Sequence, residues 1–402
     1  MPLDLAFVRH HFPGLASPWV FMDNAGGSHV LTEAADRVRD FLLTTPVQHG
    51  ASYAPSAEAS AKVQDATAAL AAMINARHPS EVVIGPSTTF LLQQLARAMA
   101  SSLRPGDEII VTDVDHESNI GPWRALERQG VVVREWPVNW ETLEFDLATL
   151  ESLLTARTRL VCVTHCSNIL GTLMPIASIA DLVHAAGAEL CVDGVAYAPH
   201  RRVDVQALGC DWYAYSFYKT YGPHQAVLWG RRERLLELDS LNHWFIGKDR
   251  VPYKLQPGNV NYELAWGCAA VPAYLEALAR HHGTDAFDAI AAHEEALAER
   301  VLAWLGARND VRIIGRRGAG RAERVPTISF VADGRRSSAI LETVDRHRVG
   351  IRFGDFYARR LIDHLGLADR DGVVRISMVH YNTPAEVDRL LAGLDEALRP
   401  GS

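Results

Sequence analysis

Short, mostly apolar runs rich in β-branched residues alternate with amphipathic stretches between residues 31 and 230. Such runs are typical of strands buried on both faces of a sheet, and apolar spacing of three to four residues is typical of surface helices. We expect strands over 82–85, 108–112, 131–136, 159–165, 188–193, 211–216 and 225–230, and helices over 31–45, 56–76, 88–102, 118–129, 146–155 and 176–186. This alternation predicts an α/β fold around a mainly parallel seven-stranded sheet.

The pattern changes near residue 263. From there we expect helices over 263–282, 285–306 and 384–398 and strands over 311–315, 327–331 and 373–377. Widely separated strands with helices between them predict a smaller C-terminal α+β domain. The predicted division is a large domain over 14–283 and a small domain over 284–402, and residues 1–13 are candidates for packing on the small domain.

Composition narrows the classes of partner. Forty basic against 48 acidic side chains give a net charge of −8, the wrong sign for sequence-independent binding to nucleic acid or an anionic membrane. No apolar run reaches the ~18–20 residues that cross a bilayer, and the N-terminal stretch lacks the pattern of a signal peptide. Five cysteines, an odd number, argue against a disulfide framework, so we expect a cytoplasmic protein.

Common cofactor and metal motifs are absent from the sequence. No G-x-G-x-x-G follows a predicted strand, and neither G-x-x-x-x-G-K-[ST] nor H-E-x-x-H occurs. Cys162 and Cys166 have no second cysteine pair at zinc-ligand spacing, so we interpret them as core residues. No metal site is expected.

Lysine is rare in this chain, which limits the candidates for covalent amine chemistry. Only four of the 40 basic residues are lysines, namely Lys62, Lys219, Lys248 and Lys254. Lys219 directly follows the predicted strand 211–216, and Asp193 ends the strand 188–193, so both lie at the carboxyl edge of the sheet, where ligands bind. Pyridoxal phosphate needs this pair, because an amine holds it covalently and a carboxylate keeps its ring nitrogen protonated.

More polar residues follow neighbouring strands. Three hydroxyl residues open the predicted helix after strand 82–85, namely Ser87, Thr88 and Thr89. Hydroxyls and free N–H groups at a helix start suit a phosphate, and an ordinary serine N-cap is the alternative interpretation. Ser216 adds a hydroxyl three residues before Lys219. His116 and Asn168 also lie at strand ends, where they are candidates to stack on a cofactor ring and to bind its hydroxyl.

A set of motifs in a fixed order covers nearly the whole chain. The motifs are MDNAGGS (22–28), STT (87–89), DHESNIGPW (115–123), THCSNILGT (164–172), VDGVAYAPHRRVDVQALGCDWYAYSFYKTYGPH (192–224), PGNVN (257–261) and VVRISMVHYNTPAEVDRL (373–390). With them the chain resembles fold-type I pyridoxal-phosphate enzymes of the class V aminotransferase group, within it the cysteine desulfurase and selenocysteine lyase branch. The resemblance implies pyridoxal 5'-phosphate as cofactor, an amino-acid substrate, and a homodimer with active sites at the subunit interface.

The resemblance also implies roles for single residues. It implies Lys219 as the Schiff-base lysine, Asp193 on the pyridine nitrogen and His116 over the ring. The cofactor residues it adds or supports are Thr88, Thr89 and Ser216 beside Ser87 on the phosphate, Asn168 at the ring, and Asn259 from the neighbouring subunit. The substrate residues are Arg375 on the carboxylate, its nearest rival Arg352, and Ala25 and Gly26.

Three positions depart from the desulfurase pattern. The persulfide-forming cysteine of that branch would fall within 349–361, where this chain has Tyr357 and no cysteine. The histidine before the lysine is Tyr218, and the glutamine that contacts the ring oxygen is Ala196. The open candidates to replace that glutamine are His200, His224 and Tyr197.

Without the thiol, such a site can still remove an α-proton, with Lys219 as the base. We expect C–S β-elimination on a cysteine S-conjugate, a reaction of cysteine-free relatives in natural-product pathways, because releasing a thiol needs no persulfide acceptor. The alternatives are an aminotransferase, an amino-acid epimerase and a decarboxylative deaminase. A non-catalytic cofactor-binding relative is a remote alternative, since Lys219 and Asp193 are both present.

Overall fold

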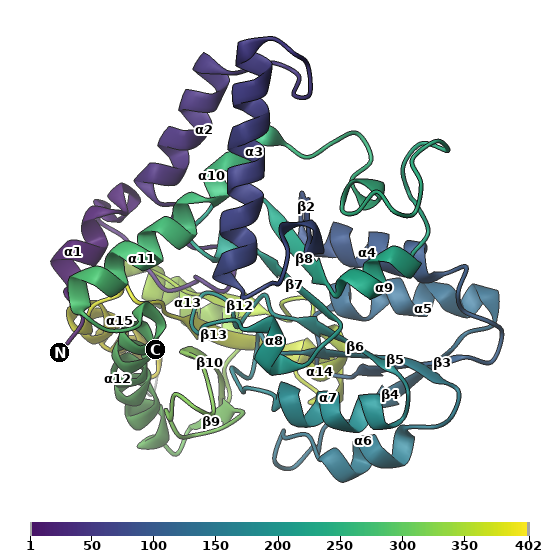
Figure 1. Cartoon of the computed structure of the whole chain (residues 1–402). Helices are drawn as coiled ribbons and strands as arrows, with labels where there is room; N and C mark the ends of the chain where they lie inside the picture. Colours follow the sequence, from purple (N-terminus) through teal and green to yellow (C-terminus); the bar gives the residue numbers. More distant parts are fainter. Residues whose placement is uncertain (1, 400–402) are drawn as a thin grey trace.

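The predicted apolar runs form one seven-stranded sheet in the computed structural model, which describes residues 2–399 (Figure 1). Its strands are β2 (Val82–Gly85), β3 (Glu108–Thr112), β4 (Val132–Trp136), β5 (Thr158–Thr164), β6 (Glu189–Asp193), β7 (Trp212–Ser216) and β8 (Ala226–Gly230). They lie in the order β2-β8-β7-β6-β5-β3-β4. Only β8 runs antiparallel to its neighbours, so the predicted mainly parallel sheet and α/β class are confirmed.

Helices cover both faces of this sheet. In β3, Ile109 packs on the face covered by α4 (Thr88–Met99), and Ile110 packs on the face covered by α7 (Ile176–Ala185). Figure 1 shows the two helical layers, which also contain α5 (Gly121–Arg124) and α9 (Arg232–Glu237) on one side and α6 (Leu147–Leu153) and α8 (Val205–Leu208) on the other. Because helices cover both faces, the strands are mostly apolar, whereas the edge strand β4 is partly exposed and carries Arg134 and Glu135.

Two predicted helices are interrupted. The stretch 118–129 divides into η3 (Glu117–Asn119), α5 and η4 (Ala125–Gln129), and the stretch 263–282 divides into α10 (Tyr262–Cys268) and α11 (Ala270–His282). Pro122 lies in the first turn of α5 and Pro272 in the first turn of α11. A proline has no N–H to bond the carbonyl four residues earlier, so each helix restarts rather than continues.

The C-terminal part forms a second sheet. Its antiparallel strands lie in the order β12 (Arg352–Gly354), β13 (Val373–Ser377), β10 (Thr327–Ala332) and β9 (Val311–Ile314). The helices of this part are α13 (Ser337–Arg346), α14 (Arg359–His364) and α15 (Pro384–Ala397). Strand β12 escaped the sequence analysis because three residues give no usable pattern.

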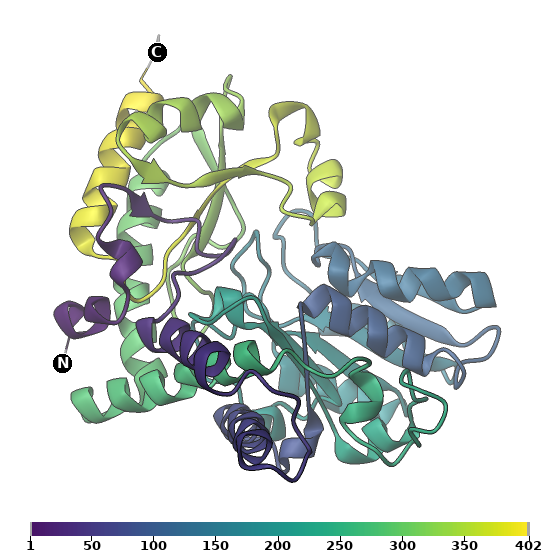
Figure 2. The same ribbon diagram turned by 90° about the horizontal axis from the view of Figure 1, so that it is seen from above.

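The N-terminal segment contacts both packing centres. It contains α1 (Leu5–His10) and β1 (Val20–Phe21), and it leads into the projecting pair α2 (Thr32–Thr44) and α3 (Ala54–Met73). Val8 and Phe12 are buried with the seven-stranded sheet, whereas β1 pairs with β11 (Val349–Gly350) beside the second sheet (Figure 2).

The long helix α12 (Ala286–Gly306) also contributes to both centres. Phe287 and Ile290 are buried with the seven-stranded sheet, and Leu297 and Leu305 are buried with the second sheet. The division at 283/284 stays a prediction, and its ends at residue 1 and residues 400–402 lie outside the described residues. Within residues 2–399, no helix is long and apolar enough to cross a membrane.

Candidate active site

The carboxyl ends of the parallel strands surround one pocket. Eight residues singled out from the sequence line it, namely Ser87, Thr88, Thr89, His116, Asn168, Asp193, Ser216 and Lys219. The pocket encloses about 450 Å³ of empty space. Parallel strands bring their carboxyl ends to one edge, so residues far apart in the sequence meet here. Ser118, Thr164 and Val195 line the pocket as well and were not predicted.

The first turn of α4 forms one end of the pocket. Ser87 caps the helix, and its hydroxyl accepts a hydrogen bond from the Phe90 N–H at 3.1 Å. The Thr88 hydroxyl lies 2.7 Å from the Ser216 hydroxyl, which joins this helix to the end of β7. Free N–H groups at the start of a twelve-residue helix attract an anion, and the paired hydroxyls add donors for its oxygens.

Asp193 ends β6 at another wall of the pocket. Its carboxylate Oδ1 accepts the Val195 N–H at 2.9 Å, and no other hydrogen bond to this carboxylate occurs within residues 2–399. Burial raises the pKa of Asp193, while the Val195 N–H and the positive charge of Lys219 oppose the rise. A cationic hydrogen-bond donor beside Asp193 would therefore complete the pairing of a buried carboxylate.

Lys219 lies in the turn η5 (Phe217–Lys219), directly after β7. The pKa of this amine is lowered to about 8, chiefly by burial and also by the nearby Arg375, while Asp193 and Asp23 oppose the shift. The amine lies 5.6 Å from the centre of the Tyr218 ring. A lysine with this pKa carries a useful fraction of neutral amine near neutral pH, which is the nucleophilic and basic form.

His116 follows β3 and is held as a neutral ring. The Ser118 N–H donates to Nδ1 at 3.1 Å, so we assign the ring proton to Nε2. Burial lowers the pKa of His116 to about 4, and the charges of Lys219 and Arg375 act in the same direction. The residue therefore offers a flat, uncharged ring with an N–H donor at the pocket.

These donors fit pyridoxal phosphate by their chemistry. An anion site lies at α4, a buried carboxylate lies at β6, an amine of lowered pKa lies at β7, and a neutral ring lies beside them. Among the described residues, no three His, Cys, Asp or Glu side chains cluster closely enough to hold a metal ion.

Two arginines lie next to the pocket, paired through an aspartate. Arg352 and Arg375 face each other across strands β12 and β13. Asp23 accepts from Arg375 Nη2 at 2.8 Å and lies 3.8 Å from Arg352 Nη1. Arg375 is buried, and its Nε has no partner among the residues described. Neither arginine lines the pocket itself, and the bridging role of Asp23 was missed by sequence reasoning.

The residues that follow Asp23 are small because they lie close to its carboxylate. A side-chain carbon at Gly26 would lie 2.9 Å from the Asp23 carboxylate, so a larger residue would push against the group that holds both arginines. The Ala25 N–H donates to the Ser377 hydroxyl at 2.9 Å. Ala25 and Gly26 therefore shape the arginine pair in this structure and do not line the pocket.

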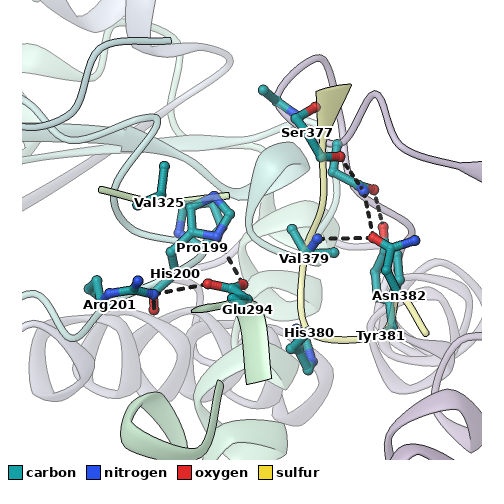
Figure 3. A network of polar contacts seen from close by, with 12 residues as sticks. Pro199, His200, Arg201, Glu294, Val325, Ser377, Val379, His380, Tyr381 and Asn382 are labelled. Atoms are coloured by element: carbon teal, nitrogen blue, oxygen red, sulfur yellow. Dashed lines mark hydrogen bonds and ion pairs between the residues drawn. The ribbon is translucent and has the colours of Figure 1, made fainter. Parts of the chain in front are cut away.

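Buried hydrogen bonds fix this segment and the loop beyond Asp193 (Figure 3). The Asn24 amide donates to the Ser377 carbonyl at 2.9 Å and to the Asn382 side chain at 3.1 Å. In the same view, the buried Glu294 of α12 faces His200, at 2.9 Å from its Nδ1, and Arg201, at 2.9 Å from its Nη1. His200 is thereby committed to Glu294 and does not line the pocket.

The candidates to replace the ring-oxygen glutamine are not brought to the pocket. Tyr197 stacks on His165 with ring centres 3.4 Å apart, and His224 stacks on Tyr218 at 4.9 Å. Neither of them lines the pocket, whereas Ala196 does. Asn259 lies in a separate hollow beside Gln48, so its predicted contact with the phosphate is not made within one chain.

The position of the missing thiol is occupied by a fixed turn. Phe356 and Tyr357 both have left-handed backbone, with φ of 50° and 61°, an uncommon conformation for bulky residues. Asn168 donates its amide to the Phe356 carbonyl at 2.9 Å, and the Glu117 N–H donates to the Tyr357 carbonyl at 2.8 Å. Arg375 lies over the Phe356 ring at 3.7 Å. These contacts hold Tyr357 beside His116.

A pH dependence follows from the lowered pKa of Lys219. In cofactor-free protein, the rate at which an aldehyde attaches to Lys219 should rise with pH up to about 8 and level off above it. Raising the pH deprotonates the amine, and roughly a tenth is neutral at pH 7 with this pKa, against well under a thousandth at the ordinary value. Stopped-flow absorbance from pH 6 to pH 10, with peptide mapping, measures it. A rate still rising at pH 10 would contradict the assigned environment.

The sequence matches the family described as Aminotransferase class-V over residues 20–390. It is 44% identical over 400 residues to the aminotransferase-like protein FGM3 of Gibberella zeae, covering 97% of this chain and 98% of that protein. It is 35% identical to the cysteine desulfurase-like protein ustD of Aspergillus flavus, covering 98% and 90%. The crystal structure of the cysteine desulfurase CsdA from Escherichia coli superposes with a TM-score of 0.87 and 26% identity, covering 99% of both chains.

Proposed function

We propose a function on one premise: the chain belongs to the class V aminotransferase family and is a pyridoxal-phosphate-dependent enzyme, a lyase or transferase. In our proposal the cofactor binds in the pocket at the strand ends. Thr88 at the start of α4 and Ser216 would hold its phosphate, Asp193 would pair with its ring nitrogen, and Lys219 would hold it covalently. When bound, the cofactor supplies an electron sink that stabilises a carbanion at the α-carbon of an amino acid.

The residues of the chain supply the remaining steps of this proposal. Lys219, displaced by the substrate amine, takes the α-proton, which its lowered pKa favours. The unpartnered Nε of Arg375 is the donor we assign to the substrate carboxylate, while Asp23 holds Nη2 of the same guanidinium. His116 keeps its Nε2 proton and lies against the ring as a neutral group.

The fixed Tyr357 turn supports elimination over persulfide transfer. A persulfide needs a mobile thiolate near the substrate sulfur, and the five cysteines of the chain are all buried. Cys166 alone among them lines the pocket, and burial raises its pKa to about 12, so it stays protonated at neutral pH. We therefore propose C–S β-elimination on a cysteine S-conjugate, in which the conjugate and one water give a free thiol, pyruvate and ammonium.

We further propose a cytoplasmic homodimer. Asn259 lies away from the pocket of its own chain, on a segment that also exposes Trp244 (94%) and Phe245 (65%). Large exposed aromatic residues are typical of interaction surfaces. In this arrangement Asn259 would reach the phosphate in the neighbouring subunit. The buried, unpaired cysteines are compatible with a reducing compartment.

The function is tested by product analysis of the holoenzyme. With S-methylcysteine we expect thiol and pyruvate in equal amounts, and we expect Cys166→Ser to keep the activity because this thiol has no role. With sulfur-35 cysteine, no label should stay on the protein after gel filtration without reductant. A keto acid without thiol would indicate transamination, racemised substrate an epimerase, and carbon dioxide a decarboxylative reaction. Stable, reductant-labile label on any cysteine would restore desulfuration.

A further inference from the structure

A second hollow adjoins the reactive pocket. The two share Thr89, His116, Ser118 and Tyr218 in their walls, so they adjoin at these residues. With the adjoining open solvent counted in both cases, the second hollow spans about 1860 Å³ and the reactive pocket about 450 Å³. A small amino acid bound with the cofactor in the reactive pocket would leave the second hollow empty. We call this second hollow the α4 groove.

Small and apolar residues form facing parts of the α4 groove, among polar residues that include Glu117 and Gln129. Ala96 of α4 and Ala100, which directly follows that helix, form one part, and Pro122, Ala125 and Leu126 form the facing part. The groove follows α4 from Thr89 to its C-cap Ala100, eleven residue steps that span ~16 Å at 1.5 Å per step. Small side chains on both helices leave the space between them open, and apolar walls favour an apolar occupant.

Two tyrosines stand where the groove meets the reactive pocket. Tyr218 stacks on His224, and Tyr357 lies with its ring centre 5.2 Å from that of His116. Both tyrosines line the groove. They occupy the two positions at which the sequence departs from the desulfurase pattern around the lysine and the thiol. The departures thus lie together at the entrance to the groove rather than at separate places.

We propose that the α4 groove receives the group attached to the β-carbon of the substrate amino acid, and that this group is long and largely apolar. The inference rests on the proposed function, since it names the substrate class of that same site. A substrate bound by its amino and carboxylate groups in the reactive pocket extends its side chain past Tyr218 and Tyr357 into the groove. Free cysteine would leave the groove empty, whereas an extended thioether would fill it. Gln93 and Arg97 line the groove along the same face of α4, where they offer hydrogen-bond donors to any polar group of the substituent.

Binding of amino acids to the holoenzyme tests the groove without requiring turnover. Each methylene moved from water to an apolar wall strengthens binding about twofold to fourfold. We expect 2-aminodecanoic acid, seven methylenes longer than alanine, to bind at least roughly 100-fold more tightly, as measured by calorimetry or by the change in cofactor absorbance. Equal affinity of the two amino acids would overturn the proposal.

A matched pair of variants locates the effect. Ala125 lies exposed on the groove wall, so Ala125→Trp fills the groove without disturbing the core, and it should reduce the affinity ratio of the two amino acids to less than tenfold. Ala303→Trp makes the same change on an exposed face of α12 and should keep the ratio. Gln93→Trp provides a second filled groove. An unchanged ratio in both filled variants would overturn the proposal.

The groove and the proposed reaction can fail separately. 2-Aminodecanoic acid has no leaving group, so its tight binding with no thiol release from any S-alkylcysteine would refute C–S elimination and keep the groove. Thiol release at the same kcat/KM from S-methyl- and S-octylcysteine would keep the reaction and overturn the groove.

Discussion

Lys219→Ala will lose roughly 10²- to 10⁴-fold of turnover, the usual contribution of one general acid–base group. The variant removes the amine that follows β7 and lines the pocket, the basic group to which we assign both cofactor attachment and proton removal. Steady-state kinetics with S-methylcysteine measures the loss. Borohydride reduction of the parent protein, followed by peptide mapping, should place the cofactor on the peptide that carries Lys219.

Lys248→Ala is the matched control. Lys248 is exposed and pairs with Asp239 at the surface, so its loss should leave turnover near that of the parent protein. Reductive label on Lys62, Lys248 or Lys254 in place of Lys219 would refute the site, because each lies outside the pocket.

Asp193→Asn will keep much of the cofactor and lose roughly 10²- to 10³-fold of turnover, the scale of one preorganised electrostatic contact. The change keeps the shape of the side chain and its hydrogen bond from Val195, but removes the charge that holds a proton on the ring nitrogen. Without that proton the ring accepts electrons poorly. Cofactor content by absorbance and turnover by product assay separate the two effects.

Asp181→Asn provides the corresponding control, because Asp181 is exposed on α7. Thermal unfolding of both variants checks that the fold is intact. Near-normal turnover of Asp193→Asn with bound cofactor would show that another group carries the charge.

The pocket was predictable because its residues occupy strand ends. Lys219, Asp193 and Ser216 each end or follow an apolar run, and parallel strands bring such positions to one edge whatever their separation in sequence. Local pattern therefore sufficed for the seven strands and for eight pocket residues. The helix restarts at Pro122 and Pro272 lay within reach of the same reasoning, since proline ends helical hydrogen bonding.

The sequence alone could not predict which residues far apart in the chain form ion pairs. Asp23 lies 352 positions before Arg375, and no local signal indicates that they bind each other. The pair forms because the segment after β1 is held to the end of β13 by hydrogen bonds such as that from Asn24 to Ser377. The α4 groove could not be predicted for the same reason. Its alanines look like ordinary helix residues in the sequence, and only the packing of the helices shows that a space lies between them.

Helix α12 makes the two packing centres one cooperative unit. Its first turns bury Phe287 and Ile290 against the large sheet, and its last turns bury Leu297 and Leu305 against the small one, along 21 residues and ~32 Å. If either centre unfolds, the half of α12 that packs on it becomes exposed to water. Unfolding of one centre alone therefore costs free energy at the apolar face of this helix. A fragment that begins at 284 would carry Phe287 and Ile290 into water, and such a fragment would be prone to aggregate rather than to fold as a free-standing module.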